Sequence, residues 1–160
     1  MAGHSCNIFR VAHRRHLPLF FIGCKCYNRA MEDKKIQHKG GCHCGALQFE
    51  FDAPSAMSLT QCNCSICAMS AYQHIFVPET DLRFICGQDE MGVYTFGTHQ
   101  ARHMFCKTCG VKPLYRPRSH PDSYSVNLRC VIGGTVKVSK IIEFDGQNWE
   151  KNISNLHKET

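Results

Sequence analysis

The chain has 160 residues, of which 43% are hydrophobic, so it can build a single domain with a modest core. Its formal net charge is +6. Positions 1–31 hold five basic residues and no acidic one, which leaves 14 basic and 13 acidic residues in positions 32–160. Proteins that read nucleic acid normally carry a basic patch on their folded part. The nearly neutral remainder therefore excludes nucleic acid as an expected partner.

Residues 1–30 are basic, free of acid and without hydrophobic periodicity, which predicts a disordered or targeting extension. The apolar run 17–23 is too short to span a bilayer and lacks a secretory cleavage site. We expect an extension over 1–38, a folded domain over 39–153 and a tail over 154–160. No membrane partner is expected, and the sequence does not identify any protein partner. The expected location is cytoplasmic or nuclear, with mitochondrial import if the extension acts as a transit peptide.

Short runs of alternating or β-branched residues, separated by Pro, Gly, Asp and Ser, predict strands along most of the domain. In Ala46–Phe51 the apolar side chains of Leu47, Phe49 and Phe51 fall on one face, as in a half-buried strand. The further strands are expected at 74–77, 82–86, 93–96, 124–130 and 135–144. Helix is expected only after Cys64 and over 149–156. The pattern indicates an all-β fold of small antiparallel sheets.

Seven of the twelve cysteines fall into three clusters, Cys42-x-Cys44, Cys62-x-Cys64-x2-Cys67 and Cys106-x2-Cys109. A disulfide between cysteines two residues apart would close a ring too small for relaxed geometry. Zinc is usually held by four ligands in structural sites and by three in catalytic sites. Seven thiolates therefore predict two zinc ions, one closed and one open, which pin the sheets together.

The four-cysteine cluster, Cys42, Cys44, Cys106 and Cys109, is the expected closed site. Cys106 and Cys109 have the spacing of a zinc knuckle, and in an extended backbone Cys42 and Cys44 face one side while His43 faces the other. Such a site joins segments about sixty residues apart, which stabilises a small domain. The alternative is that these four are reduced cysteines of the core.

The three-cysteine cluster, Cys62, Cys64 and Cys67, is the expected open and catalytic site. Three thiolates leave the zinc complex at a net charge of minus one, which makes the metal a weak Lewis acid. Such a site suits an incoming thiol, because coordination deprotonates it. A small thiol and an electrophile are the expected substrates. The alternative is closure by a protein ligand, with four candidates: His74, His99, His103 and Cys130.

A glutathione-like thiol would also need its carboxylates held. Arg116 and Arg118 stand two apart in the strand-like stretch 114–118, so they would project from one face and could each grip a carboxylate. The alternative is a solvated sheet edge, where Pro117 blocks further pairing.

The motifs Gly40-Gly-Cys-His-Cys-Gly-Ala46, Cys62-Asn-Cys-Ser-Ile-Cys67 and Phe105-Cys-Lys-Thr-Cys-Gly110 resemble the glutathione-dependent formaldehyde-activating enzyme family. Tyr94-Thr-Phe-Gly-Thr-His99, Tyr115-Arg-Pro-Arg-Ser119 and Phe144-Asp-Gly-Gln-Asn-Trp-Glu150 look like its animal, centromere protein V-like branch. The similarity covers about residues 40–151.

The resemblance implies a β-tent fold with one structural zinc on the four-cysteine cluster and a second zinc on the three-cysteine cluster. It also implies a carbon-sulfur lyase that joins formaldehyde to glutathione, giving S-hydroxymethylglutathione. A fold and its ligands do not by themselves establish turnover. The competing hypothesis is a non-catalytic zinc module with protein, chromosome or microtubule partners.

Overall fold

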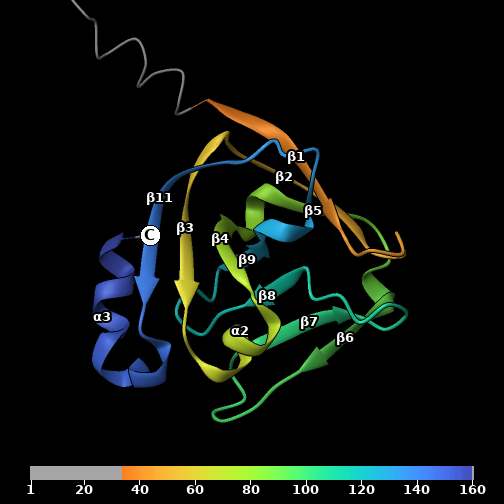
Figure 1. The fold of residues 1–160 in the computed structure, drawn as a ribbon. Coiled ribbons are helices and arrows are strands. Elements are labelled where there is room, and N and C mark those ends of the chain that lie inside the picture. The colour runs from red at the N-terminus through yellow and green to blue at the C-terminus, as the bar shows by residue number, and fades with distance from the viewer. Residues whose placement is uncertain (1–33, 160) are drawn as a thin grey trace, which may run out of the picture.

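The computed structural model describes residues 34–159, and the expected extension lies almost entirely outside them. Two β-sheets and two short helices make up most of this part of the chain (Figure 1). The first sheet has the order β10-β1-β2-β5 and the second the order β11-β3-β4-β9-β8-β7-β6. No helix among the described residues is long and apolar enough to cross a membrane.

The strands of the first sheet are β1 (Lys35–Gly41), β2 (Gln48–Pro54), β5 (Leu82–Cys86) and β10 (Val131–Ile132). Those of the second sheet are β3 (Ala56–Cys62), β4 (Gln73–Pro78), β6 (Met91–Tyr94), β7 (Arg102–Cys106), β8 (Leu114–Arg116), β9 (Ser123–Asn127) and β11 (Lys137–Phe144). The helices are α2 (Ser65–Ser70) and α3 (Trp149–Glu159). Single 3-10 turns are η1 (Glu79–Asp81), η2 (Gln88–Glu90), η3 (Leu128–Cys130) and η4 (Gly146–Asn148).

The core lies between the two sheets. As the alternation in 46–51 predicts, Leu47, Phe49 and Phe51 are 0%, 1% and 0% exposed. Phe49 and Phe51 pack in one cluster with residues of the second sheet, among them Ile75 and Val126. The two sheets therefore share one hydrophobic core, which confirms the predicted small, nearly all-β domain.

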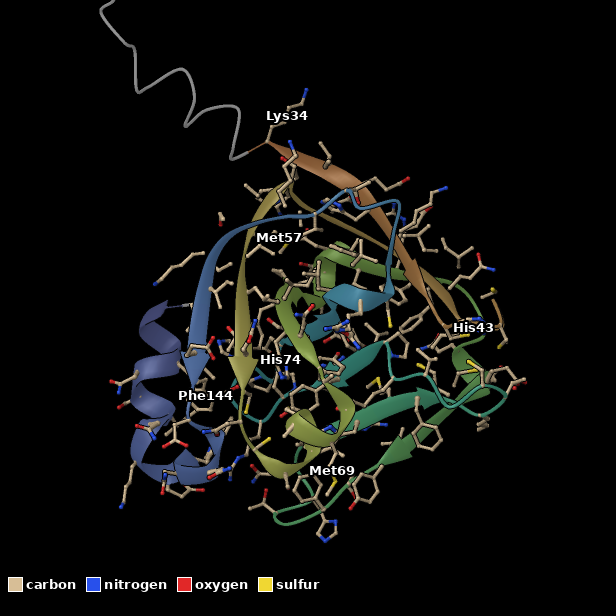
Figure 2. All side chains as sticks on the ribbon, in the orientation of Figure 1. Lys34, His43, Met57, Met69, His74 and Phe144 are labelled. Carbon is tan, nitrogen blue, oxygen red and sulfur yellow. The ribbon has the colours of Figure 1, made fainter. Side chains whose placement is uncertain are left out.

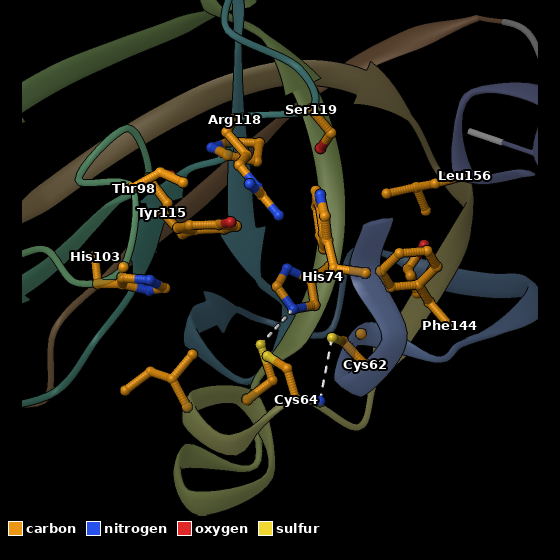
Figure 3. Close-up of a pocket in the computed structure, with 18 of the residues that line it drawn as sticks. Cys62, Cys64, His74, Thr98, His103, Tyr115, Arg118, Ser119, Phe144 and Leu156 are labelled. Atoms are coloured by element: carbon orange, nitrogen blue, oxygen red, sulfur yellow. Dashed lines mark hydrogen bonds between the residues drawn. The ribbon is translucent and has the colours of Figure 1, made fainter. Parts of the chain in front are cut away.

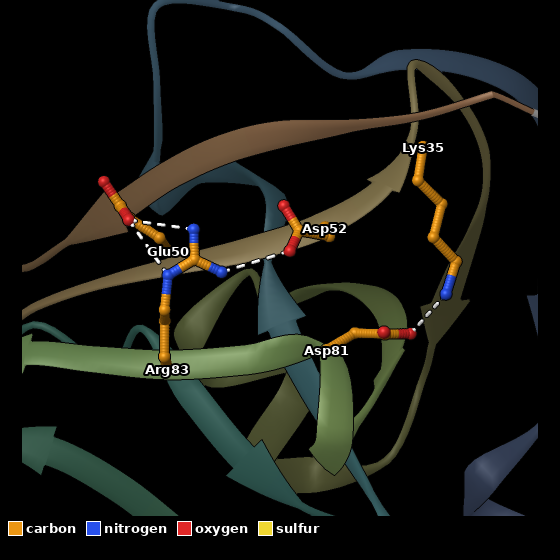
Figure 4. Close-up of polar contacts among 5 residues, drawn as sticks. All are labelled: Lys35, Glu50, Asp52, Asp81 and Arg83. Carbon is orange, nitrogen blue, oxygen red and sulfur yellow. Dashed lines mark hydrogen bonds and ion pairs between the residues drawn. The ribbon is translucent and has the colours of Figure 1, made fainter.

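The outer face of the first sheet is polar, because every second residue of β2 points away from the core. Arg83 on β5 lies 3.0 Å from a carboxylate oxygen of Glu50 and 3.1 Å from one of Asp52 (Figure 4). Lys35 pairs with Asp81 at 2.7 Å. These pairs are partly exposed, so each contributes at most about 1 kcal/mol.

Several elements differ from the expectation. The stretch expected as one strand over 124–130 ends at Asn127, whose side chain accepts a hydrogen bond from the N–H of Arg129 and starts η3. The last strand, β11, pairs in parallel with β3, whereas antiparallel sheets were expected. No strand was predicted at β1, β3, β7 or β10. Residues 35–38 lie in β1 and 154–159 in α3, both inside the expected flanking segments, and the division of the chain into parts stays a prediction.

Candidate metal centres and active site

The four-cysteine cluster forms where the turn between β1 and β2 meets the end of β7. Its four sulfur atoms all lie within 4.8 Å of one another. Gly45 and Gly110 follow the two cysteine pairs with positive φ angles of 79° and 72°, which close both turns around the sulfurs. His43 is exposed and does not belong to the cluster. Four thiolate donors at this spacing can hold one zinc ion.

Backbone N–H groups point at the sulfurs of this cluster. Leu47 N–H donates to Sγ of Cys42 at 3.3 Å. Hydrogen bonds from the backbone of Cys44 and Val111 lower the pKa of Cys109 to about 6. Since zinc binds the thiolate form, this environment fits a metal site. Cys130 also lies near this cluster, and its pKa is raised to about 11 by burial and by the charges of Cys42 and Cys109.

The three-cysteine cluster lies at the junction of β3 and α2. Cys62 ends β3, Cys64 is the residue before the first turn of α2, and Cys67 lies in that helix. Their three sulfurs also lie within 4.8 Å of one another. The two clusters are the groups of three or more close metal-ligating side chains within the described residues.

Asn63, between two of these cysteines, fixes the loop onto the segment that follows β11. Its backbone N–H donates to the carbonyl of Phe144 at 3.2 Å, and its side chain donates to Asp145 at 2.9 Å. The N–H of Gln147 donates back to the Asn63 side chain at 3.0 Å. Gly146 packs so closely that a Cβ atom there would overlap Sγ of Cys62. Two distant segments therefore set the positions of the sulfurs.

The three cysteines of this cluster have different pKa values. Hydrogen bonds from Cys62 and Cys67 lower the pKa of Cys64 to about 2. The contact with Cys64 raises the pKa of Cys62, and the contacts with Cys62 and Cys64 raise the pKa of Cys67. Without a cation the three sulfurs cannot all ionise, because like charges so close repel one another. A divalent cation would remove this conflict, so the donor set fits zinc.

The four candidates for a fourth ligand lie in different surroundings. His74 Nε2 lies 3.2 Å from Sγ of Cys67, yet His74 is not part of the group whose ligand atoms all lie within 4.8 Å. His103 lines the adjacent cavity, and His99 contacts Thr95 in an exposed turn. Cys130 lies near the four-cysteine cluster instead, since η3 turns it away from the end of β9.

A cavity of about 270 Å³ opens directly beside the three-cysteine cluster. The three sulfur-bearing residues lie at one end and Arg118 lies toward the opposite end (Figure 3). His103 and Tyr115 line one side, and Phe144 with Leu156 line the other (Figure 3). None of the residues of the four-cysteine cluster lines this cavity. Of the two clusters, the three-cysteine cluster is thus the one that borders this cavity.

The two buried histidines of the cavity are uncharged near neutral pH. Burial lowers the pKa of His74 to about 3 and that of His103 to about 4. His103 stacks on Tyr115 with ring centroids 4.6 Å apart, and its Nδ1 is buried without a hydrogen-bond partner among the described residues. The hydroxyl of Thr60, which also lines the cavity, is buried and unpartnered. Such groups are costly unless a ligand or water satisfies them.

Sequence reasoning proposed His74 and His103 only as metal ligands and did not identify Thr60. The two histidines come from β4 and β7, and Thr60 from β3. Each strand places one face toward the cavity. His74 shares one strand face with Phe76, which also lines the cavity, so the alternation in β4 could have placed the two together. Thr60 offers no such pattern.

The two arginines proposed for carboxylate binding face different surroundings. Arg116 donates two hydrogen bonds to Glu79, at 2.7 and 2.9 Å, and does not line the cavity. Arg118 lines the cavity, donates to Glu150 at 2.8 Å and lies over the ring of Trp149. The two side chains therefore do not face one shared carboxylate site, because β8 ends at Arg116.

The fold and the two clusters define a small β domain able to bind two metal ions. Residues 37–152 match the family described as glutathione-dependent formaldehyde-activating enzyme, and the chain belongs to this family. A crystal structure of a Rhodobacter sphaeroides protein is similar, with 31% sequence identity and a TM-score of 0.57. That similarity covers 66% of this chain and 99% of the bacterial chain. The family match includes both cysteine clusters.

Proposed function

We propose that this protein is a zinc-dependent carbon-sulfur lyase that joins the thiol of glutathione to formaldehyde, giving an S-hydroxymethyl adduct. The observation that carries the proposal is the position of the three-cysteine cluster at one end of a cavity, with no fourth cysteine or histidine from residues 34–159 in its group. The family to which the chain belongs supports the choice of glutathione and formaldehyde. The motifs around 94–99, 115–119 and 144–150 support assignment to the centromere protein V-like branch.

The four-cysteine cluster is proposed to hold a structural zinc, and the three-cysteine cluster a second zinc. Cys62, Cys64 and Cys67 would hold that second zinc, which would supply a position for an incoming thiol as its thiolate. The sulfur then adds to the carbonyl carbon, the carbonyl π bond breaks, and the oxygen takes up the proton that the thiol lost. No electron donor or acceptor is needed.

The residues of the cavity orient the two substrates. Thr60, His74 and His103 line the cavity and bring polar side chains next to the substrates. Arg118 is proposed to contact a carboxylate of the thiol from the end opposite the cysteines. The gain expected from holding both reactants together is proximity, because addition also proceeds without an enzyme.

The test combines a zinc count with the rate of adduct formation by exchange NMR. The wild type is expected to contain two zinc ions per chain and to exceed the buffer rate. Cys64→Ser is expected to lose one zinc ion and the added rate. Cys86→Ser is the matched control, since Cys86 is exposed and belongs to neither cluster. A folded, zinc-loaded wild type that gives no rate above buffer would overturn the proposal.

One contact favours the competing non-catalytic zinc module, namely the 3.2 Å between His74 Nε2 and Cys67 Sγ. A small shift of the ring would place this nitrogen on the metal and close the site. Cobalt substitution separates the two functions. If the site is open, glutathione changes the thiolate-to-cobalt absorption. If His74 is the fourth ligand, adding glutathione does not change the cobalt absorption spectrum, whereas the His74→Phe substitution does.

A further inference from the structure

We propose that the hydroxyl of Tyr115 donates the hydrogen bond that holds the oxygen of the aldehyde, both in the carbonyl and in the adduct. This inference rests on the proposed function, because it takes the three-cysteine end of the cavity as the place where thiol and aldehyde meet. It goes further by assigning a donor to the oxygen on which negative charge develops as the carbon-sulfur bond forms.

The direction of the Tyr115 side chain follows from its strand. Tyr115 is the middle residue of β8, which lies between β7 and β9 in the second sheet. The neighbouring Leu114 is buried and belongs to the core between the two sheets. Since the side chains of a strand alternate, Tyr115 faces the opposite side of the sheet, where it lines the cavity. The side chain therefore enters the cavity from a strand that is paired along both edges.

The ring of Tyr115 is held in place by neighbouring rings. His103 stacks on it with centroids 4.6 Å apart, and His74 and Tyr72 meet it edge to face at 5.7 and 6.4 Å. The hydroxyl at the tip of the side chain points into the open space of the cavity (Figure 3). A donor that is fixed in this way needs no rearrangement when charge appears on the oxygen that it contacts.

This hydroxyl is open to a ligand, unlike two polar atoms nearby. Among residues 34–159, the side-chain atoms that are buried without a hydrogen-bond partner are Oγ1 of Thr60 and Nδ1 of His103. The oxygen of Tyr115 is not one of them, and no hydrogen bond joins it to another described residue. Tyr115 as a whole is half-buried. Its hydroxyl therefore reaches the surface of the cavity with its hydrogen-bonding capacity unused.

Tyr115 lies on a side wall, between the cysteines at one end of the cavity and Arg118 at the other (Figure 3). The carbonyl carbon becomes bonded to the thiol sulfur, so the oxygen lies only two bonds from that sulfur and belongs on the cysteine side of the cavity. Ser119 lies with Arg118 toward the opposite end, and Nδ1 of His74 is engaged by Ser125. Tyr115 is therefore the donor best placed for the aldehyde oxygen.

The hydroxyl of Tyr115 keeps its proton near neutral pH. Burial raises the pKa of Tyr115, and the negative charges of the nearby cysteine thiolates raise it further. Tyr115 therefore acts as a hydrogen-bond donor and not as a base. In the reaction the carbon-sulfur bond forms, the carbonyl π bond breaks, and the oxygen ends with the proton that the thiol lost. Tyr115 itself is unchanged at the end.

Tyr115→Phe tests the contact, because it removes the hydroxyl and keeps the ring with its stack on His103. With glutathione and formaldehyde, kcat above the buffer rate is expected to fall at least about tenfold, while KM for glutathione stays within about twofold. Zinc content should equal that of the wild type. Tyr94→Phe is the matched control, since Tyr94 is exposed and lies outside the lining of the cavity.

Two kinetic results would overturn the inference and leave the proposed function standing. One is a Tyr115→Phe protein that reacts as fast as the wild type. The other is a raised KM for glutathione with an unchanged kcat, because the hydroxyl would then contact the thiol and not the aldehyde.

Binding can be followed without turnover, because the single tryptophan of the chain, Trp149, lines the cavity. Excess formaldehyde converts glutathione to the adduct without an enzyme, so glutathione and the adduct can each be titrated by Trp149 fluorescence. Tyr115→Phe is expected to weaken binding of the adduct about three- to tenfold and to leave the affinity for glutathione unchanged. An adduct that binds both proteins equally, or binds neither, would overturn the inference. If the loss appears but the wild type gives no rate above buffer, the proposed function fails and the contact of Tyr115 with the adduct oxygen stands.

Discussion

The hydroxyl of Ser125 lies 2.8 Å from Nδ1 of His74, and both side chains are buried in the sheet beside the cavity. This contact fixes the rotation of the imidazole, so that Nε2 is directed at Sγ of Cys67, 3.2 Å away. The pairing of β4 with β9 places the two residues on neighbouring strands. Ser125, a residue outside the cysteine motifs, thereby orients the imidazole nitrogen that faces the three-cysteine cluster.

Ser125→Ala is therefore expected to destabilise the protein by about 1–3 kcal/mol, because Nδ1 of His74 loses its partner in a buried site. Urea unfolding of the zinc-loaded protein measures the change. Ser65→Ala, in the exposed first turn of α2, is the control and should stay within about 0.5 kcal/mol. Equal stability of the two variants would show that the contact carries little free energy.

Cys106→Ser is expected to give an unfolded or insoluble chain. Cys106 is 0% exposed and belongs to the cluster that joins β7 to the turn between β1 and β2. Zinc binding in small domains contributes about 10–16 kcal/mol, which exceeds the net stability of most domains. Circular dichroism and zinc content check this. A soluble Cys106→Ser protein that retained its second zinc would refute the structural role.

Gly146→Ala is expected to lose the zinc of the three-cysteine cluster while the domain stays folded. The added Cβ would overlap Sγ of Cys62 and crowd Cβ of Cys64, so the sulfurs must move. Zinc content should fall by about one ion per chain. Gly134→Ala is the control: its φ of 60° adds backbone strain, but the new Cβ would meet nothing. Full zinc content in Gly146→Ala would contradict the prediction.

The buried His103 is expected to make stability depend on pH. Burial lowers its pKa from 6.5 to about 4. Between these two pH values the side chain is protonated in the unfolded chain and neutral in the folded protein. Its contribution is complete above pH 6.5 and is lost as the pH falls from 6.5 toward 4. At pH 5.5 the loss is about 1 kcal/mol relative to pH 7.5.

His103→Phe should keep the stack on Tyr115 and remove this part of the pH dependence. Unfolding free energies at pH 7.5 and 5.5 measure the difference, with the exposed His99→Asn as control. The same slope in His103→Phe and in wild type would show that another group titrates.

Arg118→Gln is expected to raise KM for glutathione about tenfold with little change in kcat, because Arg118 lines the cavity. Arg116→Gln is the matched control. It removes the bonds to Glu79, outside the cavity, and should leave KM unchanged. Steady-state kinetics at varied glutathione distinguish the two. A larger effect in Arg116→Gln would mean that the carboxylate binds elsewhere.

The sequence by itself determined the class of fold and the grouping of the sulfurs. Alternation identified the buried face of Leu47, Phe49 and Phe51, because side chains of a strand alternate between its two faces. The spacings within the cysteine motifs are local, so they hold whatever the rest of the chain does. Both clusters form as those spacings indicate.

The tertiary structure decided everything that depends on which strands become neighbours. Pairing of β11 with β3 brings Gly146 onto Cys62, and the order β3-β4-β9 brings His74 to Ser125. The different environments of Arg116 and Arg118 follow from where β8 ends. Such contacts join residues far apart in the chain. No local pattern encodes them, because they arise only when the two sheets close over a common core.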